Sequence, residues 1–187
     1  MKVIATEIPD LYIIEPIVIS DHRGYFLETY SQGKLTEKGL NYQWIQDNES
    51  MSNCGVVRGL HYQLNPYAQA KLVRVIAGEV VDVVVDIREG SPTFGKKFEI
   101  TLSAKNKLQL LIPRGFAHGF SVLQDGTIFS YKCDNYYNKE YERGINPFDP
   151  ALNIDWKIAQ NEAILSEKDQ LNPTLSNATT TIQYQSR

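Results

Sequence analysis

Short runs of β-forming residues, separated by Gly, Pro, Asn and Asp, follow one another along most of the chain. Many short strands bounded by turn residues are typical of a β-sandwich or a β-barrel, so the pattern predicts a mainly β fold. The predicted strands lie at 11–20, 56–63, 71–76, 80–87, 97–102, 108–112 and 127–133.

The run at 80–87 alternates strictly, so its two faces differ. One face is wholly apolar and is predicted to pack in a core; it carries Val81, Val83, Val85 and Ile87. The opposite face mixes two carboxylates into apolar surface; it carries Val80, Asp82, Val84 and Asp86.

Helical signals are few. A short helix is predicted at 31–38, where Gly39 ends it, and one or two further turns at 161–169. After Pro173 the chain is rich in Thr, Ser, Asn and Gln, so the polar tail at 173–187 is predicted to be either disordered or an added edge strand. Without a repeat or a linker, residues 1–187 are expected to form one domain.

Composition narrows the function classes. The 187 residues are 42% hydrophobic and 22% charged, which excludes wholesale disorder, and a net charge of −3 offers no general field for nucleic acid or an anionic membrane. An anionic ligand therefore requires a local basic cluster.

The two cysteines are far apart, no apolar run approaches the ~20 residues that span a bilayer, and the first residues lack the apolar core of a signal peptide. We therefore expect a cytoplasmic protein.

The densest polar cluster is RGLHYQ at 58–63, followed closely by Lys71. Strict alternation places Gly59 and His61 on one face, and the glycine leaves room there for a ligand, so His61 is a candidate for a cavity. Arg58 points to the other face unless Gly59 forms a bulge, and the sequence leaves both arrangements open. The alternative for His61 is an ordinary core histidine with satisfied hydrogen bonds.

A second cluster, PRGFAHGF at 113–120, contains P-x-G-x-x-H after a predicted strand. This motif resembles the second half-motif of the cupin superfamily, which implies a double-stranded β-helix, or jelly roll. Metal cupins usually offer H-x-H in the first motif, whereas this chain has only His61 there, followed by Tyr62 and Gln63. We therefore expect no catalytic metal.

A barrel that holds one histidine, one lysine and several tyrosines is equipped for proton transfer next to a carbonyl group. Neutral His61 can abstract the proton, since an imidazole of pKa ~6.5 suits work near pH 7. Lys71 can stabilise the enolate, and Tyr131 is a candidate acid on the opposite face, where it would invert the carbon. The alternative for Tyr131 is plain aromatic packing.

Together, these clusters and several further blocks resemble the dTDP-4-dehydrorhamnose 3,5-epimerase family. The match runs in order from about residue 3 to residue 172, and the ordered set is far more specific than any single block. The blocks are DHRGYF at 21–26, QDN at 46–48, RGLHYQ at 58–63, KLVR at 71–74, GEVVDVVVDIR at 78–88, SPTFG at 91–95, IPRGFAHGF at 112–120 and SEKD at 166–169.

The resemblance implies a cupin-type jelly roll, usually a homodimer, that acts without metal or other cofactor. The implied reaction inverts carbons 3 and 5 of dTDP-4-dehydro-6-deoxy-D-glucose, a step of dTDP-L-rhamnose synthesis. Carried over block by block, His61 is the base, Asp169 its partner, Lys71 the enolate stabiliser and Tyr131 the proton donor. A local alternative for Asp169 is that it only caps a turn with Ser166.

The resemblance also implies a substrate-binding set, which supplies the local positive cluster. Arg23 and Lys168 would hold the diphosphate, with Arg58 near the diphosphate or the sugar. The nucleoside would lie against Glu28, Gln46 and Asn48, with Phe26 suited to stacking, while His118 and Glu142 would line the site. In the family, the segment from Arg23 to Glu28 often reaches across the dimer.

The resemblance leaves three alternatives for the activity. Relatives with the same His, Lys and Tyr act at carbon 3 only, so a monofunctional epimerase on a related dTDP-4-keto-6-deoxy sugar is the first alternative. A metal-dependent cupin enzyme is the second, and a non-catalytic nucleotide-sugar binder is the third. The chain departs from the family at Ala70, where glycine is common, and this position carries neither the acid nor the base.

Overall fold

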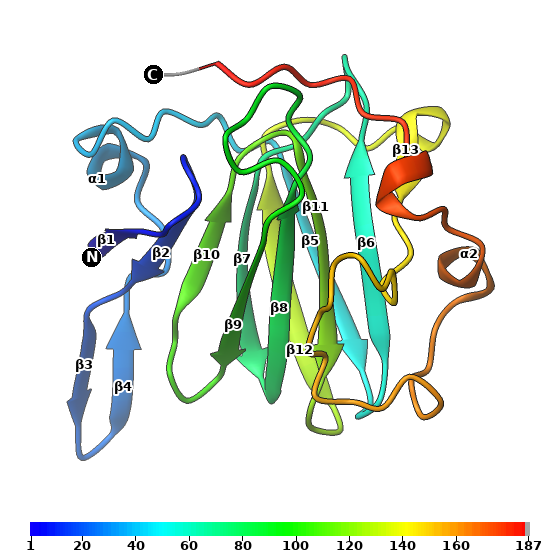
Figure 1. The fold of residues 1–187 in the computed structure, drawn as a ribbon. Coiled ribbons are helices and arrows are strands. Elements are labelled where there is room, and N and C mark those ends of the chain that lie inside the picture. The colour runs from blue at the N-terminus through cyan, green and yellow to red at the C-terminus, as the bar shows by residue number, and fades with distance from the viewer. Residues whose placement is uncertain (186–187) are drawn as a thin grey trace.

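Two antiparallel sheets face each other in the computed structural model, which describes residues 1–185 (Figure 1). The six-stranded sheet has the order β1 (Lys2–Ala5), β2 (Tyr12–Glu15), β10 (Gln109–Ile112), β7 (Lys71–Ala77), β12 (Thr127–Cys133) and β5 (Gln46–Ser52). The five-stranded sheet has the order β13 (Glu142–Gly144), β6 (Val57–Gln63), β11 (Phe116–Val122), β8 (Glu79–Asp86) and β9 (Lys97–Ser103). Most neighbours are distant in sequence, so the predicted jelly-roll sandwich is confirmed.

The remaining elements lie outside this sandwich. Strands β3 (Val18–Asp21) and β4 (Gly24–Leu27) form a separate hairpin, which projects away from both sheets in Figure 1. The short helices are α1 (Gln32–Thr36) and α2 (Glu167–Gln170), with single turns at η1 (Lys139–Tyr141) and η2 (Leu175–Asn177). Within the described residues, no helix is long and apolar enough to cross a membrane.

The alternation predicted for the run at 80–87 is confirmed in β8. Val80 and Val84 lie between the sheets, in a core that also contains Phe120 and Phe129. The opposite face packs against the segment after β13, where Trp156 is among the largest buried side chains. Because the five-stranded sheet is covered on both faces, the carboxylates of β8 are fully buried and must find partners inside the protein.

Other boundaries differ from the prediction. The run at 11–20 is broken at Pro16, which cannot donate a ladder hydrogen bond, and divides into β2 and β3. The helix at 31–38 forms only as α1, and of the turns at 161–169 only α2 forms, after Ser166 caps its first turn. Strand β5 was not predicted, since its alternation is of polar residues with few β-formers.

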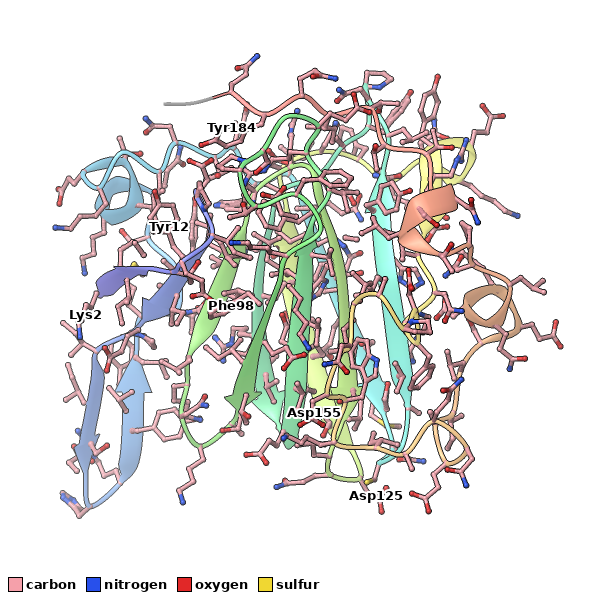
Figure 2. All side chains as sticks on the ribbon, viewed as in Figure 1. Lys2, Tyr12, Phe98, Asp125, Asp155 and Tyr184 are labelled. Carbon is pink, nitrogen blue, oxygen red and sulfur yellow. The ribbon has the colours of Figure 1, made fainter. Side chains whose placement is uncertain are left out.

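The described part of the polar tail packs across the end of β8. Tyr184 lies over the guanidinium of Arg88 at 4.9 Å from the ring centroid, and Phe116 lies over the same group at 4.5 Å. Figure 2 shows Tyr184 on the C-terminal segment that runs across one end of the sheets. Gln183 forms a single parallel bridge with Glu89. Of the predicted tail at 173–187, positions 186–187 lie outside the described residues.

Candidate active site

Two adjoining cavities open between the sheets. The outer cavity is about 300 Å³ and the inner one about 150 Å³, and both are lined by His61, Lys71 and Tyr131. The outer cavity is also lined by Gln46, Asn48, Tyr62, Gln63, Gln69, Tyr137 and Glu142. The inner cavity is also lined by Ser50, Arg58, His118, Gly119, Phe120 and Phe129.

The three shared residues come from opposite walls. His61 lies on β6 of the five-stranded sheet, whereas Lys71 on β7 and Tyr131 on β12 belong to the six-stranded sheet. Strands β7 and β12 are hydrogen-bonded neighbours, and Lys71 Nζ lies 5.9 Å from the centroid of the Tyr131 ring. A ligand between the walls therefore has an imidazole on one side, and an ammonium and a phenol on the other.

His61 is bound to a carboxylate that comes from far along the chain. Its Nε2 lies 2.5 Å from Asp169 Oδ1, and Asp169 is only 3% exposed. Burial favours a higher pKa for Asp169, but the hydrogen bond and charge of His61 outweigh it, so the pKa is lowered and the carboxylate stays ionised. An ionised carboxylate only accepts, so Nε2 of a neutral His61 carries the hydrogen and Nδ1 is left as the basic nitrogen.

Helix α2 places Asp169. The Ser166 hydroxyl accepts a hydrogen bond from the Asp169 amide at 3.1 Å and so caps the helix, while the Asp169 side chain reaches His61 and accepts from the Gly59 amide at 3.5 Å. The predicted turn with Ser166 therefore exists, but the carboxylate is not what caps it. Its side chain is free to act on the imidazole.

The side chain of Lys71 is held in the cavity without an ion pair or hydrogen bond to the rest of residues 1–185. Burial lowers the pKa of its ammonium, and the charges of Cys133, Asp82 and Glu142 oppose this. Burial also raises the pKa of Tyr131, so its hydroxyl keeps its proton at neutral pH. The ammonium of Lys71 is thus left without a protein partner among the described residues, and Tyr131 is a protonated acid.

A β-bulge in β6 determines the direction in which Arg58 points. In the ladder between β6 and β11, His61 pairs with His118 and Arg58 pairs with Phe120, so two residues of β6 oppose the single Gly119. Gly59 has φ +133°, and a Cβ there would lie 2.5 Å from the Gly119 Cα. The bulge brings Arg58 and His61 to the same inner cavity, against strict alternation.

Arg58 is also tethered. Its Nε donates to the Ser52 hydroxyl at 3.1 Å, and Ser52 is buried at the end of β5. The guanidinium makes no ion pair within the described residues, so it adds a second available cation to the inner cavity. Two unpaired cations beside each other favour an anionic or strongly polar ligand.

The rim of the outer cavity is a connected polar network. The Tyr137 amide donates to Gln46 Oε1 at 3.1 Å, and Gln46 Nε2 donates to Asn48 Oδ1 at 3.1 Å. The Tyr137 hydroxyl donates to Glu142 Oε2 at 2.8 Å, and Glu142 Oε1 pairs with Lys168 Nζ at 2.5 Å. Gln46, Asn48, Glu142 and Lys168, all predicted to bind substrate, are therefore joined through Tyr137.

Tyr137 and Gln63 are site residues that the sequence did not single out. Gln63 is 5% exposed; its Nε2 donates to the carbonyls of Tyr67 and Tyr136, and its Oε1 accepts from the Asn138 amide. This side chain thus holds the backbone on both sides of Tyr137, which stands half-exposed at the rim. No periodic signal marks such a residue, since it lies in a polar loop.

Four predicted binding residues line neither cavity: Arg23, Phe26, Glu28 and Lys168, of which Lys168 touches the rim through its ion pair with Glu142. Arg23 lies at the tip of the β3–β4 hairpin, where it pairs with Asp21 at 2.5 Å. Phe26 on β4 is 69% exposed, and Glu28 pairs with Lys34 at 2.7 Å. Within one chain, Arg23, Phe26 and Glu28 therefore line neither of the cavities around His61.

His118 lies in the inner cavity as predicted, with its Nε2 2.9 Å from Asp82 Oδ2. Burial lowers the pKa of His118 and outweighs the opposing effect of Asp82.

Residues 1–185 contain no cluster of three or more His, Cys, Asp and Glu side chains arranged to hold a metal ion.

Comparison with known proteins agrees with this geometry. A family model described as dTDP-4-dehydrorhamnose 3,5-epimerase matches residues 5–177. A dTDP-4-dehydrorhamnose 3,5-epimerase of Shigella flexneri is 56% identical over 170 residues, which are 90% of this chain and 93% of that protein.

Solved structures agree as well. The crystal structure of dTDP-4-dehydrorhamnose 3,5-epimerase from Elizabethkingia anophelis NUHP1 has a TM-score of 0.91 and 54% identity, covering 95% of this chain and 97% of the other. A dTDP-6-deoxy-D-glucose-3,5-epimerase of Legionella pneumophila Philadelphia 1, in complex with dTDP-4-keto-L-rhamnose, has a TM-score of 0.94 and 46% identity, covering 99% of both chains. The chain belongs to the dTDP-4-dehydrorhamnose 3,5-epimerase family.

Proposed function

We propose that the protein converts dTDP-4-dehydro-6-deoxy-D-glucose to dTDP-4-dehydro-L-rhamnose by inverting carbons 3 and 5, without a metal or other cofactor, as a step of dTDP-L-rhamnose synthesis. The observation that carries the proposal is the arrangement of His61 and Tyr131 on opposite walls of one cavity, with Lys71 beside Tyr131. Inversion needs a base on one face of a carbon and an acid on the other, and this cavity offers both.

The first step is removal of a proton from the carbon next to the ketone. His61 takes it on Nδ1, since Nε2 is bound to Asp169. The imidazolium that forms is stabilised by the buried carboxylate, and the pair also fixes the direction of the ring. A positioned base of this kind contributes roughly 10²–10⁴-fold to the rate.

The negative charge then moves to the ketone oxygen, where Lys71 meets it. A cation in a site shielded from water stabilises such an oxyanion better than it would in bulk solvent, and a single donor is worth roughly 2.7–4 kcal/mol. Because Lys71 has no partner within the described residues, no protein ion pair has to be broken first.

Return of a proton from the other wall completes the inversion. The Tyr131 hydroxyl donates to the face of the carbon opposite His61, and its raised pKa keeps it protonated until then. Carbons 3 and 5 flank the same ketone, so one base, one acid and one lysine serve both centres as the ring presents each carbon in turn, once His61 has released its proton to solvent and Tyr131 has regained one from solvent.

The nucleotide portion is assigned to the outer cavity and to a second copy of the chain. Gln46, Asn48, Glu142 and Lys168 form the rim on one protomer. Arg23, Phe26 and Glu28 are supplied by the partner hairpin in a homodimer. The exposed apolar surface of this hairpin supports the assignment: Ile17 is 66% exposed, Ile19 62% and Phe26 69%. We place the enzyme in the cytoplasm, in keeping with its unpaired Cys54 and Cys133.

The decisive experiment is incubation with dTDP-4-dehydro-6-deoxy-D-glucose in D2O, followed by NMR at both ring positions. Deuterium at carbons 3 and 5 supports the proposal. Deuterium at carbon 3 alone identifies a monofunctional 3-epimerase, and no exchange with clear thermal stabilisation by the ligand identifies a nucleotide-sugar binder. Loss of exchange on treatment with EDTA, restored by a metal, would identify a metal-dependent cupin enzyme.

A further inference from the structure

A second buried histidine–carboxylate pair lies behind the inner cavity, and the proposed chemistry does not use its carboxylate. Asp82 on β8 is 0% exposed, and its Oδ2 lies 2.9 Å from Nε2 of His118 on the neighbouring strand β11. His118 lines the cavity, whereas Asp82 does not. The carboxylate therefore acts on a ligand only through the imidazole or through its charge.

Asp82 is costly at this position. Its Oδ1 is buried without a hydrogen bond, one of only two such side-chain atoms among the described residues. Its neighbours on the same face of β8 are Val80 and Val84, which fill the core without polar atoms. A valine would satisfy packing there, so the carboxylate has a role other than filling space.

The His118 ring is held on several sides. It stacks on Phe129 at 6.0 Å between centroids and lies 6.4 Å from Phe120. Burial lowers the pKa of the imidazole, which keeps it neutral near pH 7. The carboxylate oxygen of Asp82 accepts the hydrogen bond from this ring, so a neutral His118 carries its hydrogen on Nε2, and Nδ1 keeps a lone pair.

His118 offers the inner cavity a hydrogen-bond acceptor, in addition to the hydroxyls of Ser50 and Tyr131 that also line it. Lys71 and Arg58 only donate hydrogen bonds, and His61 is committed to the reacting proton. A keto-sugar ring presents hydroxyl groups, and each needs an acceptor when it leaves water. Nδ1 of His118 makes no hydrogen bond within residues 1–185, so it is the ring atom left for a ligand.

We propose that Asp82 is a positioning residue: it fixes His118 as the Nε2–H tautomer, so that Nδ1 accepts a hydrogen bond from a hydroxyl group of the sugar. The identity of that hydroxyl-bearing ligand rests on the proposed function. The tautomer does not, because it follows from contacts within the chain.

Two variants distinguish the positioning role of Asp82 from the effect of its charge. Asp82→Val removes the acceptor in a side chain that fits the strand, while Asp82→Asn removes the charge but keeps a carbonyl that can accept from Nε2–H. Long-range 15N–1H NMR, with His118 assigned by loss of its signals in His118→Asn, reports the tautomer directly. We expect Nε2–H alone in the wild type and in Asp82→Asn, and a mixture in Asp82→Val. A wild-type ring protonated on Nδ1 overturns the inference.

Steady-state kinetics give the second readout. We expect kcat/KM to fall about tenfold in Asp82→Val, the worth of one lost hydrogen bond, and to stay within about threefold of wild type in Asp82→Asn. The double variant Asp82→Val/His118→Asn should be no worse than His118→Asn alone. Thermal unfolding of each variant checks that the comparison is made between folded proteins.

The outcomes are distinct. Equal losses of kcat/KM in Asp82→Asn and Asp82→Val mean that the charge of Asp82 matters and its positioning of His118 does not, which overturns the inference. A double variant in which the losses of the two single variants multiply overturns it as well. A wild type that exchanges no deuterium into the sugar overturns the proposed function and the hydroxyl assignment together, while the NMR arm still decides the tautomer.

Discussion

The inner cavity and the β3–β4 hairpin differ in which side chains they bury and which they expose. Around the cavity, buried carboxylates are matched by histidines, as in the pairs Asp169–His61 and Asp82–His118. On the hairpin, Ile19 and Phe26 lie in solvent. The buried carboxylates around the cavity have their partners within one chain, whereas the exposed apolar side chains of the hairpin form a surface suited to contact with a second chain.

This difference separates chemistry from anchoring. The proposed base, oxyanion stabiliser and acid all come from strands of the sandwich, where packing on both sides fixes their positions. Arg23, one of the two basic residues predicted to hold the diphosphate, is at the hairpin tip and lines neither of the two cavities around His61 in its own chain. The proton-transfer groups are thus predicted to function in cis and the hairpin residues in trans, and the following tests address this contrast.

The largest effect is expected at the base. His61→Ala removes the group that takes the proton, so solvent exchange into the sugar should fall by roughly 10²–10⁴-fold or become undetectable. Deuterium incorporation measured by NMR checks it, and unchanged ligand-dependent thermal stabilisation shows that the cavity still binds. Wild-type exchange in this variant would remove His61 from the mechanism.

A separation of steps is expected at the acid. Tyr131→Phe keeps the ring in the cavity but removes its hydroxyl, so product formation should fall more than initial proton loss. Comparing deuterium wash-in to the substrate with the appearance of epimerised product measures the split. Equal losses in both rates would show that the phenol does not act as the returning acid.

The trans assignment predicts a specific number. Arg23→Ala and His61→Ala should each be inactive or strongly impaired alone, yet an equal mixture allowed to exchange subunits should recover about a quarter of wild-type activity. Half of the dimers are then mixed, and one of the two sites in each mixed dimer is intact. No recovery, despite demonstrated subunit exchange, would place Arg23 at the site of its own chain.

A smaller effect is expected on assembly. Ile19→Asp puts a charge into the exposed apolar face of the hairpin, so the dimer should dissociate at protein concentrations where the wild type stays associated. Light scattering over a dilution series measures this, with Lys2→Asp as a charge-altering control on β1. A wild type that is monomeric throughout would contradict the proposed interface itself.

The smallest effect is expected at the tail, remote from both regions. Tyr184→Ala removes one of the two aromatic rings over the Arg88 guanidinium and should lower the free energy of unfolding by about 1 kcal/mol, with little effect on activity. Urea denaturation measures the loss, and Tyr136→Ala, a tyrosine that is 62% exposed, serves as the control.

The sequence predicted the sandwich because apolar alternation is a local signal. The faces of β8 and the extent of β12 follow from period-2 patterning alone. Strand β5 was not predicted because its pairing with β12, rather than its own residues, makes it a strand. That the chain forms a single domain stays a prediction.

The site was predicted unevenly, for related reasons. Short motifs marked His61, Lys71 and Tyr131, but the bulge at Gly59 depends on its close approach to Gly119 on another strand, which no local pattern encodes. The roles of Gln63 and Tyr137 were missed because they arise from contacts between the end of β6 and the loop that follows β12. The catalytic and binding roles themselves stay predictions until the variants are measured.

The single turn of α2 links two chemistries through adjacent residues. Lys168 meets Glu142 at the rim while the next residue, Asp169, meets His61. Gain of one amino acid in the loop ahead of this turn would present the Lys168 ammonium to the imidazole in place of the Asp169 carboxylate and reverse the sign of the charge beside it, whereas loss of one would present the uncharged amide of Gln170. The length of that loop is therefore under the same constraint as the identity of the residues it delivers.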